Sequence, residues 1–471
     1  MALISELRSP SELHIAKGRV VTSRLLLVLA RLPPSNDHSA RGDPISEPTS
    51  DVSGDSDIPA QSRGIYRGWH VIGVSALSIG VILGTVQFTF GFFIEPLEQE
   101  FGWSRTQVNF ALSIGVVTSF LSPIVGNLMD RVGAKWTMAG SILLVAIAFL
   151  LRSIMTELWQ FYLFSAVMFA GTPGATMMPA GRLVLTWFPK TRGRMMGIVT
   201  SGNNIGSGLA VPIIAVLIGA VGWRWTWALM GIVLIGLAML VVLVIRDNSE
   251  DVIKEQRKRW APPEVSEQDK SVLKGGMTVS AAVRTSAFWF LVIGMTLQQF
   301  VRTGVVSQMV PHLEQVGFTR TIAASMMIVL AVFAGSSKLI FGRLSESITA
   351  RVSFIVIMIL QGIGLSILLV SGGSIVTWGA IVVFGLGMGG VGALTPLVIF
   401  DMFGLKQFGS IMGLTRMAIA VPIFVGPIMA GFIFDARGKY DLMFLITIGL
   451  LILSIGSFLM AKVPGGKTLS K

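Results

Sequence analysis

Four cationic side chains stand inside long apolar segments of this sequence, where a charge is costly. They are Arg182, Arg302, Lys338 and Arg416. In a segment that crosses a bilayer, an ionised side chain at the centre costs about 2.5–3.5 kcal/mol on insertion scales, so it usually faces a partner or a water-filled cavity. The interiors of the apolar segments hold essentially no carboxylate that could pair with these cations. We therefore predict a cavity with excess positive charge, which attracts an anion.

Lys338 and Arg416 are the strongest candidates for anion binding. Lys338 shares a helix face with small residues such as Gly335, and Arg416 shares one with Gly413. Such a face can line a cavity or accept a packed helix. The alternative for Lys338 is a side chain that extends to the nearby end of its segment and binds no substrate. We predict that both residues bind substrate, because a guanidinium can hold a carboxylate with two parallel hydrogen bonds and an ammonium adds a point charge.

The remaining polar groups leave alternatives open. Arg302, in the stretch QQFVRTGVVSQ, either binds substrate or is satisfied by the neighbouring amides and by backbone carbonyls. Arg182 lies only about a turn from the end of its segment, so gating contacts are the preferred interpretation there. Asn203 and Asn204, in the stretch GNNIGSG, could donate hydrogen bonds to a substrate.

The composition indicates an integral membrane protein. The 471 residues are 52% hydrophobic and only 13% charged, whereas a soluble domain carries about 25% charged residues. Cysteine is absent, so disulfides and thiolate metal sites are excluded, and we expect neither a metal nor a cofactor. The net charge of +12 could suggest nucleic acid, but its distribution fits membrane topology instead, so no nucleic-acid partner is expected.

Twelve apolar runs are long enough to span a bilayer, which takes about 20 residues. They cover 69–95, 105–128, 135–153, 159–187, 194–219, 223–245, 286–310, 320–343, 351–371, 375–401, 407–433 and 441–461. The predicted fold class is an all-α membrane protein with twelve transmembrane helices in two pseudo-symmetric six-helix bundles. The predicted domains are a disordered N-terminal tail (1–66), the first bundle (67–246), a charged linker (247–284), the second bundle (285–462) and a C-terminal tail (463–471).

Lysines and arginines are distributed unequally between the two sides of the predicted bundles. If the two tails and the linker lie on one side of the membrane, most lysines and arginines lie on that side, in the tails, the linker and the loops there. The opposite side holds Arg105, Arg152, Arg224, Arg320, Arg437 and Lys439. Because cytoplasmic loops carry an excess of these residues, we predict that both termini are cytoplasmic. A bacterial inner membrane is the expected location.

The two predicted bundles repeat a short pattern. GNLMDRVGAK follows the second apolar run and GRLSESITAR follows the eighth, and their first glycines lie 216 residues apart. Each copy holds an acid four residues after the glycine and a base nine residues after it. The pairs are Gly126 with Gly342, Asp130 with Glu346, and Lys135 with Arg351. Duplicated halves around a central site are typical of secondary transporters.

The repeated pattern resembles the signature of the major facilitator superfamily. The first copy matches it fully at Gly126, Asp130, Arg131, Gly133 and Lys135. The second copy has Thr349 in place of the second glycine. The resemblance implies alternating access by rocking of the two halves, with the charged signature residues latching the cytoplasmic side.

A narrower resemblance covers about 67–460, through stretches such as RGWHVIGVSALSIG and LTWFPKTRGRMMGIVTSGNNIG. These stretches are similar to the bacterial monocarboxylate-transporter-like and oxalate/formate-antiporter branch, which moves small carboxylates. Lys338 and Arg416 stand where that branch has its substrate cations. Gln87 and Ala334, however, stand where the monocarboxylate family often has a lysine and an aspartate linked to proton coupling. Anion exchange needs neither group, and a proton could also travel on the substrate.

The function predicted from these observations is secondary active transport of small organic anions, either mono- or dicarboxylates, and not enzymatic activity. The expected partners are the anion, a proton or counter-anion, and membrane lipid, and a monomer is expected. Two alternatives stay open. A drug exporter of the same fold would normally carry a buried carboxylate, and a non-transporting sensor would bind ligand without flux.

Overall fold

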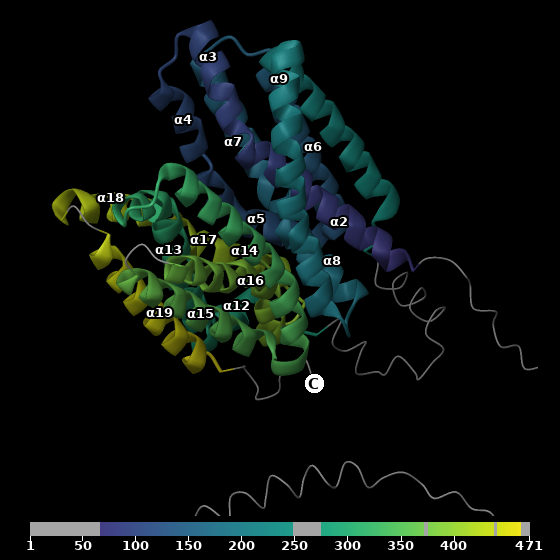
Figure 1. Ribbon diagram of the computed structural model, residues 1–471. Helices are drawn as coiled ribbons and strands as arrows, with labels where there is room; N and C mark the ends of the chain where they lie inside the picture. The colour runs from purple at the N-terminus through teal and green to yellow at the C-terminus, as the bar shows by residue number, and fades with distance from the viewer. Residues whose placement is uncertain (1–65, 248–274, 372–374, 438–439, 463–471) are drawn as a thin grey trace, which may run out of the picture. The chain divides into compact units, whose positions relative to one another are not determined.

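The computed structural model describes residues 66–247, 275–371, 375–437 and 440–462 (Figure 1). The predicted disordered tail, the middle of the linker and the C-terminal tail lie outside these residues. Within them the secondary structure is helical, apart from one isolated bridge between Gly276 and Gly404.

The helices form two successive groups along the chain (Figure 1). The N-terminal half contains α2 (Arg67–Leu83), a π-helical turn (Gly84–Phe88), a 3-10 turn (Phe90–Phe93), α3 (Ile94–Phe101), α4 (Arg105–Ser113), α5 (Val116–Val132), α6 (Ala134–Ser153), α7 (Leu158–Ala175), α8 (Met177–Trp187) and α9 (Arg192–Val244). The C-terminal half contains α12 (Val279–Val283), α13 (Ser286–Gln315), α14 (Arg320–Ile348), α15 (Ala350–Val370), α16 (Ile375–Phe403), α17 (Phe408–Ala418), α18 (Ala420–Arg437) and α19 (Asp441–Met460).

These helices confirm the predicted twelve crossings within the described residues. Ten helical segments are long and apolar enough to span a membrane. The 53-residue α9 counts once among them, but Gly222, with φ of 78°, breaks it into two crossings. The short apolar α17 and the following α18 together supply one more crossing. The predicted run boundaries lie within a few residues of the helix ends because apolar length is the quantity that a bilayer fixes.

The internal duplication appears as two reciprocal contacts between the halves. Gly126 on α5 packs against the backbone of Gly409 at the start of α17, so closely that a Cβ atom would not fit. Gly342 on α14 packs in the same way against Gly193 at the start of α9. Each contact maps onto the other when 216 residues are added or subtracted. Glycine is needed at these positions because the two backbones approach without room for a side chain.

Thr349 adopts a backbone conformation that normally requires glycine. Its φ of 84° and ψ of 148° are close to the φ of 95° and ψ of 165° of Gly133, the matching position in the first copy. Among the described residues it is the only one other than glycine with a positive φ. A β-branched residue there is strained, at a cost of order 1–3 kcal/mol. The second copy therefore forms the same turn as the first, but with threonine in place of the glycine that adopts this conformation easily.

Replacing Thr349 with glycine should stabilise the protein by about 1 kcal/mol, because relief of the strain exceeds the entropy cost of a new glycine. The substitution removes only a long hydrogen bond, 3.4 Å, from the Val352 backbone N–H to the Thr349 hydroxyl. Thermal unfolding in detergent, followed by tryptophan fluorescence, measures the change in Tm. The reverse change, Gly133→Thr, should lower Tm, because a Cβ there would collide with the Asp247 carboxylate. A lower Tm for Thr349→Gly would contradict the strain.

Candidate functional site

Asp130 joins the two halves through both of its carboxylate oxygens. It lies near the end of α5, where Arg182 of α8 donates a 2.9 Å hydrogen bond to Oδ1. Across the interface, the backbone N–H of Gly409 donates to Oδ1 at 3.0 Å and that of Ser410 to Oδ2 at 2.8 Å. The Ser410 hydroxyl donates a further bond of 2.7 Å to Oδ2. A carboxylate at the first turn of α17 also interacts favourably with the positive end of the helix dipole.

Glu346 repeats this arrangement in the second copy. It lies near the end of α14 and accepts a 2.8 Å bond from the backbone N–H of Arg194 in the first turn of α9. The Arg194 guanidinium donates a second bond of 2.9 Å to the same carboxylate. Each copy of the signature therefore caps a helix in the opposite half. We refer to the end of the bundles that holds Asp130 and Glu346 as the gate end.

A third connection at the gate end was not predicted from the sequence. Arg192, at the start of α9, forms an ion pair of 3.2 Å with Asp401 near the end of α16. The Arg192 guanidinium also stacks on the ring of Phe400, 4.8 Å from its centroid. Asp401 is only 5% exposed, so this pair is held together in a largely dry environment. The two residues are too far apart in sequence for any local pattern to have linked them.

The other predicted gating residues bond within their own halves. Arg131 donates to Asn127 at 3.2 Å, and the Lys135 backbone N–H donates to Asp247 at 2.9 Å. Arg351 donates to the backbone carbonyl of Leu459 at 2.8 Å. Gly133 forms the turn between α5 and α6. In this conformation the cross-interface bonds of the signature therefore come from its acids and not from its bases.

Arg182 pairs with Asp130. Its only ion pair among the described residues is the one with Asp130, in line with the preferred interpretation from the sequence. By supplying a cation beside the latching carboxylate, it balances the charge of Asp130 inside the N-terminal half.

Lys338 points across the interface toward α9 and not toward the end of its own helix. Its ammonium donates 3.1 Å to the backbone carbonyl of Thr200 and 2.7 Å to Oδ1 of Asn204. The residue is 9% exposed. Gly335, one turn earlier on α14, lies against the Asn204 amide and leaves room for it. Both partners of Lys338 are neutral, so its charge remains uncompensated.

Arg416 and Arg302 are the other two cations predicted inside apolar segments of the C-terminal half. Arg416 is half-buried in the last turn of α17, just before the break that separates α17 from α18. Arg302 lies in the middle of α13 with an exposed side chain. It is within electrostatic range of both Lys338 and Arg416. In the described ranges neither guanidinium makes a hydrogen bond or an ion pair.

The neighbouring polar groups of α13 do not satisfy Arg302. The Gln298 amide is directed at Gln361 on α15, 3.5 Å away. The Thr303 hydroxyl donates 2.9 Å to the backbone carbonyl of Pro422 on α18. These two side chains therefore bond to other helices and not to Arg302.

Two other predicted site residues do not meet the cations. Gln87 is exposed in the π-helical turn of the first crossing and makes no contact with Lys338. Asn203 is half-buried, and its Oδ1 atom is buried without a hydrogen-bond donor. Of the two adjacent asparagines, Asn204 alone bonds to Lys338.

Arg152, which the sequence assigned to the side opposite the tails, is a buried cation. It is 2% exposed in the last turn of α6. Its guanidinium lies over Phe161 at 4.9 Å and Trp227 at 5.5 Å, and it donates to the hydroxyl of Ser165. Cation–π contacts stabilise a guanidinium in such a setting. Arg152 therefore packs α6 against α7 and α9, and aromatic residues far away in sequence gave no local signal for it.

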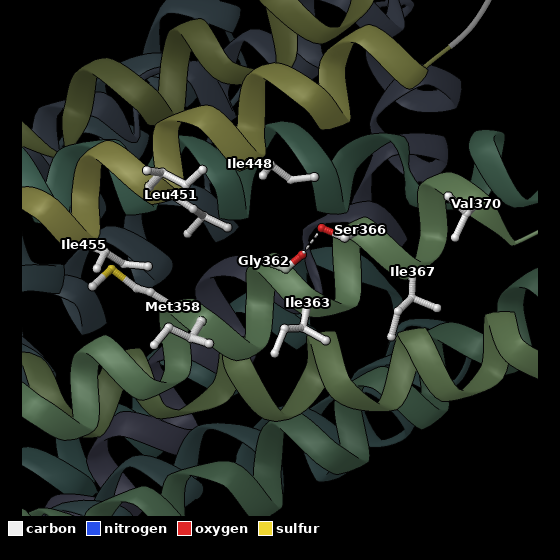
Figure 2. A pocket seen from close by; sticks show the side chains of 11 residues that line it. Met358, Gly362, Ile363, Ser366, Ile367, Val370, Ile448, Leu451 and Ile455 are labelled. Atoms are coloured by element: carbon white, nitrogen blue, oxygen red, sulfur yellow. Dashed lines mark hydrogen bonds between the residues drawn. The ribbon is translucent and has the colours of Figure 1, made fainter. Parts of the chain in front are cut away.

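The cavity drawn in Figure 2 has an apolar lining and contains none of these cations. It has a volume of about 540 Å³ and lies between α15 and α19. Aliphatic side chains line it, and its one hydroxyl, on Ser366, is bonded to the carbonyl of Gly362 (Figure 2). It offers no charge to an anion. Within the described residues no cluster of acidic or histidine side chains could hold a metal ion.

The chain belongs to the major facilitator superfamily. The model of that family matches residues 76–427 and 291–470. The architecture is also similar to the solved structure of the proton:xylose symporter XylE, with a TM-score of 0.63 and 15% identity over 86% of this chain and 98% of that one.

Among characterised relatives, monocarboxylate transporter 2 of Mus musculus is 23% identical over 420 residues, which cover 83% of each protein. The fujikurins efflux protein of Gibberella fujikuroi is 24% identical over 335 residues, 70% of this chain and 67% of that protein. The family model establishes a transporter family, and the different substrates of these relatives leave the substrate of this chain open.

Proposed function

We propose that this protein is a secondary active transporter of small organic anions, either mono- or dicarboxylates. The observation that carries the proposal is the buried ammonium of Lys338, whose partners are both neutral, together with Arg302 and Arg416, which form no ion pair among the described residues. An organic anion supplies the missing charge. The similarity to a monocarboxylate transporter supports the same substrate class.

Transport would proceed by alternating access between the two bundles, residues 67–246 and 285–462. In the described conformation Asp130, Glu346 and the Arg192–Asp401 pair hold the gate end closed. We expect this end to face the cytoplasm, because its loops carry an excess of lysine and arginine. The bonds of these acids would break and re-form once in each cycle.

Anion exchange fits the site better than a proton symport in which an acidic residue of the site would carry the proton. Lys338 has neutral partners only, and the position one turn before it is Ala334. Without a substrate, the cluster of positive charges would have to move through the low-dielectric centre uncompensated, which disfavours the return of the empty carrier. A loaded carrier reorients more easily, and this difference couples the entry of one anion to the exit of another.

Efflux of a larger organic molecule is the second candidate, favoured by the similarity to the fujikurins efflux protein. The cation cluster would then recognise an acidic group on an otherwise apolar compound. In the part of the chain that the structure describes, no titratable carboxylate pairs with these cations, which argues against an exporter of organic cations.

Uptake of labelled carboxylates into proteoliposomes tests the proposal. We expect rapid uptake of a small carboxylate when the vesicles contain unlabelled anion, and slow uptake when they do not. A pH gradient alone should drive little uptake. The anion-exchange proposal fails if uptake follows the pH gradient without internal anion, and the substrate class fails if no carboxylate moves. Active export of hydrophobic acids would then favour the second candidate.

A further inference from the structure

Lys338 forms its two side-chain hydrogen bonds across the interface between the halves. Both acceptors, the Thr200 carbonyl and Oδ1 of Asn204, lie on α9, whereas Lys338 lies on α14. The backbones meet at the same place, since a Cβ on Gly197 of α9 would come within 2.6 Å of the Lys338 carbonyl oxygen. Any movement that separates α14 from α9 must therefore break both bonds of the ammonium, which we call the Lys338 bridge.

The matching position in the first copy shows that such a helix crossing does not need a bridge. Ser122, 216 residues before Lys338, lies on α5 at the corresponding contact with α17, where Gly413 packs against its backbone carbonyl. The Ser122 hydroxyl donates 2.7 Å to the Thr118 carbonyl of its own helix. The two crossings pack alike, so the Lys338 bridge is an addition that can break without disrupting the packing of the interface.

We infer, resting on the proposed function, that the Lys338 bridge holds the gate end of the empty carrier closed and that a bound carboxylate releases it. Asn204 is the positioning residue that directs the ammonium toward α9. When a carboxylate binds, the ammonium turns to the anion and its bonds to α9 are lost. The hydrogen bonds of Asp130 and Glu346 then hold the halves together without the bridge, and the gate end opens more often.

The bonds that the ammonium must give up explain why the anion favours opening. A ligand shifts an equilibrium only by as much as its affinities for the two states differ. In the closed conformation two of the three ammonium N–H groups bond to α9, so an anion must displace these bonds. In the open conformation the same groups would be free, and the anion binds more tightly. The anion can displace Asn204, because opposite charges attract each other more strongly than a charge attracts a neutral amide.

A pair of spin labels, one on each half, measures the opening of the gate end. The natural chain has no cysteine, so two introduced cysteines carry the labels. Val132→Cys at the end of α5 and Lys406→Cys between α16 and α17 are exposed positions at the gate end. We expect one dominant short distance between the labels in the empty protein. Addition of lactate or succinate, whichever raises the Tm of the purified protein, should increase the population of a longer distance.

Asn204→Ala should raise the ratio of open to closed conformations in the empty protein by about tenfold or more, which corresponds to the loss of one hydrogen bond to a charged group. Added carboxylate should then change the ratio less than it does in the wild type. Asn203→Ala is the matched control, because Asn203 is adjacent and does not bond to Lys338. It should leave the distances unchanged.

Asn204→Asp should act in the opposite direction. An aspartate holds the ammonium more strongly than an amide does, because it carries the opposite charge. Added carboxylate should therefore open the gate end less than in the wild type and bind about tenfold more weakly. A variant that merely disturbed the packing of α9 would not tighten the gate end, so this change separates positioning of Lys338 from a structural role of Asn204.

The outcomes separate this inference from the proposed function. If neither carboxylate raises the Tm or changes the distances, the proposed function fails and the inference with it. If a carboxylate raises the Tm but Asn204→Ala leaves the distances of the empty protein as in the wild type, the inference is overturned and anion transport stands. An equal shift in Asn203→Ala would overturn it as well. If Asn204→Ala does not fold, Asn204→Asp decides, since opening by carboxylate equal to that of the wild type contradicts the bridge.

Discussion

Replacing Asp130 with asparagine should open the gate end. The carboxylate accepts hydrogen bonds from Arg182, from two backbone N–H groups and from the Ser410 hydroxyl. An amide of the same shape cannot accept all of these bonds, and its own N–H₂ group would face other donors. A hydrogen bond to a charged group contributes about 1.5–3 kcal/mol. Loss of about 3 kcal/mol would move the equilibrium about 100-fold toward the conformation open at this end.

A single introduced cysteine measures this opening, because the natural chain contains none. Thr200 is suitable: it is 2% exposed on α9, next to Lys338, and cysteine has nearly its size. We expect a membrane-impermeant maleimide applied at the gate end to label Thr200→Cys slowly, and to label the Asp130→Asn double variant at least tenfold faster. Anion exchange should slow, because the closed gate would form less often.

Asp247→Asn is the matched control. Asp247 accepts a bond of 2.9 Å from the Lys135 backbone within the N-terminal half, so its neutralisation should not change the labelling rate. Glu346→Gln should have a weaker effect than Asp130→Asn, since Glu346 bonds only to Arg194, whose side chain is 49% exposed. Equal labelling with and without Asp130→Asn would show that this carboxylate does not hold the halves together.

The helices and the duplication were predictable because they depend on local quantities. The run expected at 135–153, for example, corresponds to α6 at Ala134–Ser153. The 216-residue spacing between the two signature copies can be read from the sequence, and the reciprocal glycine contacts have the same spacing. The sequence also showed that Thr349 stands where the first copy has a glycine. Only the structure shows that Thr349 has a positive φ.

Pairings between distant residues could not be predicted in the same way. Lys338 and Asn204 were both candidates, but their hydrogen bond depends on how α14 meets α9. The Arg192–Asp401 pair and the burial of Arg152 depend likewise on helices that sequence order does not bring together. The sequence assigned Arg152 to the side opposite the tails and gave no indication that it is buried. Packing against Phe161 and Trp227 keeps it buried.

Lys338→Gln should strongly reduce anion exchange. The ammonium is the buried cation whose partners, the Thr200 carbonyl and Asn204, are both neutral. An incoming carboxylate can replace Asn204, because two opposite charges attract each other more strongly than an ammonium attracts a neutral amide. Loss of the charge should lower kcat/KM by about 10- to 100-fold, which corresponds to one hydrogen bond to a charged group. Lys338→Arg, which keeps the charge, should lose far less.

The contact with Asn204 distinguishes substrate binding from a structural role of Lys338. If Lys338 only tied α14 to α9, Asn204→Ala would impair exchange as much as Lys338→Gln does, because either change removes the 2.7 Å bond. We expect Asn204→Ala to change exchange by less than about threefold, since it leaves the charge in place. Lys462→Gln, at an exposed position beyond α19, controls for loss of any lysine. Equal losses in Lys338→Gln and Asn204→Ala, with lowered Tm in both, would assign Lys338 to the scaffold and leave Arg416 and Arg302 as the only free cations among the described residues of the site.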